Sequence, residues 1–155
     1  MKPYYQTDTT DVTGNCIQYA VASLMEMEPS EVPVFTPDNW ITAFYEFFNR
    51  HGCNVFPGLR LEHEIVRYFI DAISFEFAPM YCLLGVRSFK HKRVSHCVVG
   101  LLTPGGHNHI QIIHDPNREN ANRSKGEYII RDVDLLLPIT PRAKELILRY
   151  RWESK

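Results

Sequence analysis

The sequence has no long hydrophobic run, no excess of either charge and few of the residues that mark linkers. No apolar stretch approaches the roughly 18 residues that a membrane-spanning helix needs, so we expect no membrane association. Seventeen lysines and arginines against eighteen aspartates and glutamates leave a net charge of −1, without the basic excess typical of nucleic-acid binding. Eight glycines and ten prolines in 155 residues exclude collagen-like and linker-like sequence.

Cysteines are few and widely spaced. None of the four belongs to a Cys-x-x-Cys pair, which is the usual basis of a structural zinc site. The first eight residues lack the apolar stretch of a signal peptide, so we expect the chain to stay in the cytoplasm with its thiols reduced. We expect neither a bound metal nor a cofactor.

What the chain does have is the composition of one folded domain. Hydrophobic residues make up 45% and charged residues 23%, which is ordinary for a soluble globular protein. Intrinsic disorder is therefore excluded for most of the chain. The length predicts a single domain over residues 1–155 with its own core.

Helical periodicity dominates the first half of the chain and strand patterns dominate the second. Apolar residues recur every three or four positions in four segments, and five short runs rich in Val, Ile and Leu indicate strands. The expected helices are 16–27, 38–50, 62–72 and 141–152; the expected strands are 80–86, 96–102, 109–114, 128–130 and 133–138. This order predicts an α+β fold, with N-terminal helices packed on a C-terminal antiparallel sheet.

Gly14-Asn15-Cys16 stands immediately before the first expected helix. Unpaired backbone N–H groups and the positive end of the helix dipole would stabilise a thiolate there, and the thiolate is the nucleophilic form of cysteine. We therefore treat Cys16 as a candidate nucleophile. The alternative is a small residue that packs at the entrance of a helix.

A histidine and an aspartate fall opposite each other if the strands around residues 96–115 form a hairpin. The stretch 103–108 has the composition of a tight turn. Centring that turn between Gly105 and Gly106 places His96 directly opposite Asp115 on the same face, with Cβ atoms about 5 Å apart. A carboxylate there would fix the imidazole tautomer and stabilise the imidazolium.

The order Cys16, His96, Asp115 predicts a cysteine nucleophile, its base and an orienting carboxylate. Each residue also has a plain structural interpretation: His96 as a core histidine, and Asp115-Pro116-Asn117 as an ordinary turn. The coincidence of all three positions favours the catalytic interpretation.

These residues resemble papain-like cysteine peptidases, in particular the compact double-glycine bacteriocin-processing peptidases. In that group a Gln precedes the cysteine-bearing helix, one strand begins His-x-Val and another ends Asp-Pro. The opening segment also resembles small uncharacterised phage and bacterial proteins. The matching segments are Gln6-Thr7-Asp8, Gly14-Asn15-Cys16, Ala22-Ser23-Leu24, Glu31-Val32-Pro33, His96-Cys97-Val98 and His114-Asp115-Pro116.

The resemblance implies a papain-like fold and a thiol hydrolase that cleaves a peptide, isopeptide or amide bond in a peptide or protein substrate. It implies Cys16 as nucleophile, His96 as general base and Asp115 as orienting residue, with Asn117 as the alternative orienter. Gln6 would donate to the oxyanion beside the Cys16 N–H; its distance of ten residues from Cys16 is longer than is usual in the family. The implied location is the cytoplasm, that of the host if the gene belongs to a phage.

Other functions stay open at this point. Transglutaminases and deamidases can use the same three residues. His107 and His109, two apart on an expected strand, could hold a catalytic metal together with Asp115 or His114. A non-catalytic phage or bacterial binding protein on the same scaffold is the third alternative, and Cys16 would then be replaceable. The sequence does not indicate an oligomeric state.

Overall fold

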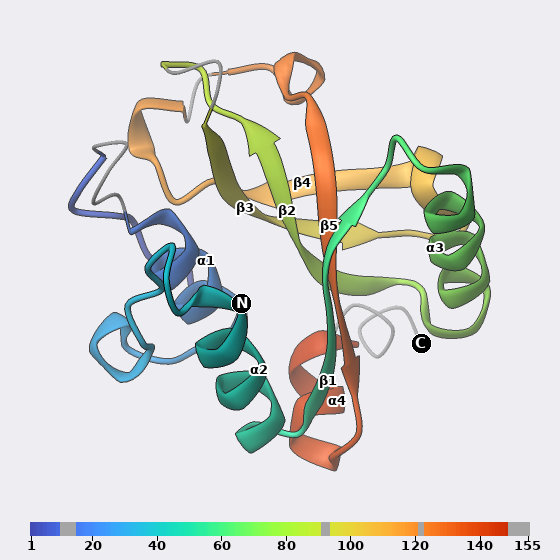
Figure 1. Cartoon of the computed structure of the whole chain (residues 1–155), viewed down its shortest axis with the longest axis horizontal. Helices are drawn as coiled ribbons and strands as arrows, with labels where there is room; N and C mark the ends of the chain where they lie inside the picture. The colour runs from blue at the N-terminus through green and yellow to red at the C-terminus, as the bar shows by residue number, and fades with distance from the viewer. Residues whose placement is uncertain (10–14, 91–93, 121–122, 149–155) are drawn as a thin grey trace.

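Four α-helices and a five-stranded antiparallel sheet make up the part of the chain that the structure, a computed structural model, describes: residues 1–9, 15–90, 94–120 and 123–148 (Figure 1). The helices are α1 (Cys16–Met25), α2 (Trp40–Arg50), α3 (Glu64–Phe77) and α4 (Pro141–Ile147). The strands are β1 (Cys53–Arg60), β2 (Met80–Arg87), β3 (Ser95–Leu102), β4 (Ile110–His114) and β5 (Ile130–Pro138), in the spatial order β1-β5-β2-β3-β4. The predicted α+β class is confirmed.

The core lies where α1 and α4 pack against the central strands. Helix α1 contacts β3 and β2, while α4 contacts β5 and β2. Every residue from Met80 to Val86 in β2 is buried, which requires cover on both faces of the strand. The face of α1 that contacts the sheet includes Ala20, Val21 and Leu24, all at most 1% exposed. This packing fixes the start of α1 against β3.

Strand β1 is a strand that the sequence analysis missed. Its sequence contains Pro57 and Gly58, which disrupt the alternation typical of a strand. The register against β5 shifts between Phe56 and Leu59, so Pro57 and Gly58 form a bulge, with Gly58 at a φ of 64°. An edge strand tolerates such an interruption. The expectation that the three N-terminal helices precede every strand is therefore wrong, because β1 lies between α2 and α3.

Several expected boundaries also differ. Helix α1 ends at Met25 rather than 27, because Glu26 adopts a left-handed conformation with φ 55°. Helix α2 starts at residue 40 rather than 38, and α3 covers 64–77 rather than 62–72. The two strands expected at 128–130 and 133–138 form one strand, β5. Part of the helix expected to end at 152, and Gly14 before α1, lie outside the described residues. None of the described helices is long and apolar enough to cross a membrane.

The connection between β3 and β4 is longer than the predicted two-residue turn. Residues Gly106–His109 form a 3-10 helix, η2. In the β3–β4 ladder Leu102 pairs with Ile110. A bulge between Gly100 and Val99 then shifts the register, so that Val99 pairs with His114. The predicted pairing of His96 directly opposite Asp115 is therefore wrong. The longer turn and the bulge together shift the register by two residues, so Asp115 keeps the same face of the sheet as His96.

Candidate active site

Cys16, His96 and Asp115 lie together where the start of α1 meets the start of β3. The imidazole of His96 lies close enough to the Cys16 thiol for each group to shift the pKa of the other. Nε2 of His96 lies 2.6 Å from Oδ1 of Asp115. Because Nε2 faces Asp115, Nδ1 is the nitrogen available to Cys16. The structure thus brings together the three residues that the sequence analysis placed in one site.

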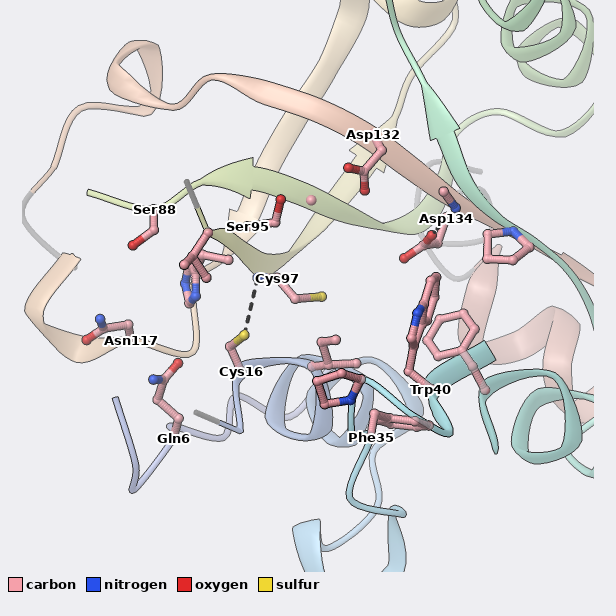
Figure 2. A pocket seen from close by; sticks show the side chains of 18 of the residues that line it. Gln6, Cys16, Phe35, Trp40, Ser88, Ser95, Cys97, Asn117, Asp132 and Asp134 are labelled. Atoms are coloured by element: carbon pink, nitrogen blue, oxygen red, sulfur yellow. Dashed lines mark hydrogen bonds between the residues drawn. The ribbon is translucent and has the colours of Figure 1, made fainter. Parts of the chain in front are cut away.

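The sulfur of Cys16 accepts a hydrogen bond from the backbone. The N–H of Cys97 donates to Sγ at 3.4 Å, the contact dashed in Figure 2, and the nearby N–H of Ile17 also lowers the pKa of the thiol. Burial alone raises the pKa of the Cys16 thiol, but the hydrogen bond and positive charge of His96 outweigh burial. The pKa of Cys16 therefore lies below that of an ordinary thiol, and the thiolate is favoured.

His96 and Asp115 form a charged pair next to the Cys16 sulfur. Burial lowers the pKa of His96, but the hydrogen bonds to Asp115 and Cys16 raise it to about 9. Burial raises the pKa of Asp115, but the contact with His96 outweighs it and holds that pKa below its usual value. At neutral pH the imidazole therefore carries its proton, beside the Asp115 carboxylate and the Cys16 sulfur.

Asp115 is held by four hydrogen bonds. Oδ1 accepts from His96 and from the backbone N–H of Asn117 at 2.7 Å. Oδ2 accepts from Asn120 Nδ2 at 2.9 Å and from the Tyr128 hydroxyl at 2.7 Å. The side chain is only 7% exposed, so a buried carboxylate has its acceptor sites filled. This network fixes the plane of the carboxylate and hence of the imidazole.

Replacing Tyr128 with phenylalanine removes one of these donors and nothing else. We expect the free energy of unfolding to fall by about 1–2 kcal/mol, because a hydrogen bond to a charged group is lost. Urea denaturation followed by circular dichroism measures the change. Tyr45→Phe, at a 38% exposed tyrosine on α2, is the matched control and should change stability by less than about 0.5 kcal/mol. Equal effects of the two substitutions would contradict the assigned hydrogen bond.

The other three cysteines have the opposite electrostatic environment. Burial raises the pKa of Cys53 to about 11, and it raises the pKa values of Cys82 and Cys97 far above the ordinary range. All four cysteines are free thiols. Of the four cysteines, Cys16 alone therefore has a pKa that is shifted toward the thiolate form.

Gln6 lies at the site beside Cys16 (Figure 2). Its backbone N–H donates to the Pro116 carbonyl at 2.9 Å, which ties it to the loop that follows Asp115. Its Nε2 donates to the Asp8 carbonyl at 2.9 Å, and that carbonyl also accepts from the N–H of Asn15. Because Asp8 and Asn15 are neighbours in space, Gln6 reaches the site despite its ten-residue separation from Cys16. An amide nitrogen has two hydrogens, so one is left for an oxyanion.

Asn117, the alternative orienting residue, forms a hydrogen bond with Asp115 rather than with His96. Its backbone N–H donates to Asp115, while its side-chain Oδ1 accepts from the N–H of Glu119 at 3.0 Å. The carboxylate of Asp115, and not the amide of Asn117, makes the contact with the imidazole.

The histidines considered as metal ligands have other partners. His107 and His109 lie in η2 rather than on a strand. Nδ1 of His107 lies 2.8 Å from Oδ1 of Asp71 on α3, and Nε2 of His114 lies 2.8 Å from the Tyr4 carbonyl. Within the described ranges, no three side chains of the usual ligand types form a group that could hold a metal ion.

Cys16, the candidate nucleophile, lines a cleft of about 660 Å³. Aromatic side chains from α2 and the segment before it line one wall, and two aspartates of β5 line another (Figure 2). The lining side chains used below are Phe35, Trp40, Asp132 and Asp134. The cleft is large enough to hold several residues of an extended peptide.

The sequence analysis did not find Asn120, Tyr128, Asp132 or Asp134. Asn120 lies in a short 3-10 helix, Arg118–Asn120, and Tyr128 lies in irregular chain before β5; neither position has a periodicity that signals a partner. The two aspartates alternate along β5, a period-two pattern that was available, but it does not tell which face lines a cleft.

No family model, no curated protein and no solved structure matches the chain. The resemblance to papain-like peptidases therefore depends on the residues quoted for it.

Proposed function

We propose that the protein is a papain-like thiol hydrolase that cleaves a peptide, isopeptide or amide bond in a peptide or protein substrate. The observation that carries the proposal is the grouping of Cys16 beside His96, which is hydrogen-bonded to Asp115, in a large cleft. The nucleophile on the first helix, against a sheet strand that carries the base, supports a papain-like arrangement.

In the first half of the reaction the Cys16 thiolate attacks the substrate carbonyl carbon. The oxyanion that forms accepts hydrogen bonds from the Cys16 N–H, which has no partner within the helix because it lies at the start of α1, and from the Gln6 amide. His96 then transfers its proton to the leaving nitrogen, the C–N bond breaks, and an amine departs. Cys16 is left as a thioester.

In the second half, neutral His96 takes a proton from water, and the resulting hydroxide attacks the thioester carbonyl. The C–S bond breaks, a carboxylic acid product leaves, and the thiolate–imidazolium pair is restored. Asp115 keeps the imidazole oriented in both halves and stabilises its charged form.

Mass spectrometry of peptide, isopeptide and amide libraries in water enriched in heavy oxygen tests the proposal. A hydrolase places one heavy oxygen in each new carboxylate, and Cys16→Ala abolishes product. Cys53→Ala, at a buried cysteine in β1, is the matched control and retains turnover. An amine-transfer product without heavy oxygen would identify a transglutaminase instead. Full turnover by Cys16→Ala would refute the role of this thiol.

A further inference from the structure

Two carboxylates face the cleft some distance from the nucleophile. Asp132 and Asp134 alternate on β5, so their side chains leave the same face of the sheet, and Figure 2 shows both pointing into the cleft. The backbone N–H of Gly58, in the β1 bulge, donates to Asp134 at 2.6 Å. Asp132 occupies the space that a Cβ on Gly85 would need. The surrounding backbone is therefore shaped to hold both carboxylates.

The charge of these carboxylates is only partly balanced by the protein, because Arg60, the cross-strand partner of Asp132, forms its ion pair with Glu62. Burial and the neighbouring Asp132 together raise the pKa of Asp134 to about 7, although the Gly58 N–H lowers it. Burial also raises the pKa of Asp132, although Arg60 and Arg131 oppose the shift. Among the residues that the structure describes, no lysine or arginine makes an ion pair with either aspartate. Two adjacent half-buried carboxylates without an ion pair of their own would be stabilised by a ligand that supplies a cation.

The sheet fixes the distance from this pair to the reacting sulfur. Cys97 pairs with Gly85, and Gly85 pairs with Asp132, so the three residues form one row across β3, β2 and β5. Strands lie about 4.8 Å apart, which places Asp132 roughly 10 Å from the backbone that contacts Cys16 Sγ. An extended peptide advances about 3.4 Å per residue. A long side chain one to three residues from the scissile bond can therefore reach the carboxylates.

An aromatic surface adjoins the acidic pair. Trp40 and Phe35 line the same cleft, and Figure 2 shows the ring of Trp40 beside Asp134. Lysine and arginine bury their aliphatic stems on such a surface while the charged end meets a carboxylate. We propose that Asp132, Asp134 and Trp40 form a subsite for a lysine or arginine side chain of the substrate, one to three residues from the cleaved bond. This inference rests on the proposed function.

Peptide vinyl sulfones test this subsite without knowledge of the natural substrate. Each probe alkylates Cys16 irreversibly by addition of the thiolate to the vinyl carbon. Probes in a matched set carry lysine or its apolar isostere norleucine at the first, second or third residue from the reactive group. Intact mass spectrometry gives the second-order rate, and each rate is divided by the rate with iodoacetamide. The variants are Asp132→Asn and Asp134→Asn, with Glu145→Gln, at an exposed position of α4, as the matched loss of one charge.

We expect the wild type to react with the lysine probe about tenfold faster than with the norleucine probe at one position. Asp132→Asn and Asp134→Asn should reduce that preference to less than about twofold, while Glu145→Gln keeps it. Equal rates at all three positions, or a preference that survives both asparagine variants, would overturn the subsite but not the proposed function. Failure of iodoacetamide itself to label Cys16 would instead overturn both.

Discussion

Replacing His96 with alanine should reduce the alkylation of Cys16 at pH 6 by about tenfold or more. In the wild type, the charge and hydrogen bond of His96 hold the pKa of Cys16 below its ordinary value. Without them the thiol returns toward a pKa near 8.5 or above, so that its thiolate fraction at pH 6 falls below about 1%. A more basic thiolate is the better nucleophile, which offsets part of the loss. Peptide mass spectrometry after timed iodoacetamide treatment gives the rate.

Two further variants separate the electrostatic effect from misfolding. His96→Gln retains a side-chain amide that can still donate to Asp115, yet carries no charge, so it should lose the reactivity as well. His63→Ala, at a histidine that is 60% exposed before α3, should react like the wild type. An unchanged rate in both His96 variants would show that His96 does not activate the thiol.

Asp115→Ala should reduce the free energy of unfolding by about 3–5 kcal/mol, the usual cost of removing one partner from a buried charged pair. The substitution leaves the imidazolium of His96 without its carboxylate and deprives Asn117, Asn120 and Tyr128 of their acceptor. Urea denaturation at pH 7 measures the loss. Asp38→Ala, at an exposed aspartate before α2, is the control. A loss below about 1 kcal/mol would mean that the network contributes little.

The loss of stability caused by Asp115→Ala should depend on pH. The pKa of Asp115 is lower in the folded protein than in the unfolded chain, where it is about 3.9. Its contribution is therefore fully present above that unfolded value and is lost as the pH falls through the folded pKa. The difference in stability between the wild type and Asp115→Ala should accordingly shrink in strong acid. A constant difference down to about pH 2 would contradict the lowered pKa.

The position of Cys16 could be predicted from sequence because it depends on local features. An apolar repeat at helical spacing begins at that residue, and the start of a helix favours a thiolate whatever the tertiary fold. Strand β1 could not be found in this way. Pro57 and Gly58 are ordinary signals of a loop, and only the pairing with β5 makes the segment a strand.

The contact between His96 and Asp115 was expected from a register that the structure does not have. The turn is longer than predicted, and the bulge at Val99 and Gly100 adds a second shift. Because side chains on a strand alternate with a period of two, two shifts of one residue restore the original face. Neither shift is encoded in a local pattern, since loop length and bulges depend on what packs around them.

A titration of the Cys16 thiolate tests the central claim most directly. The far-ultraviolet absorbance of thiolate is followed against pH for the wild type, and the same titration of Cys16→Ser is subtracted. The account predicts a midpoint below about 8.5, the ordinary thiol value, so that Cys16 ionises before His96 loses its proton at about pH 9. A midpoint at or above the ordinary value would contradict the thiolate–imidazolium pair on which the proposed function depends.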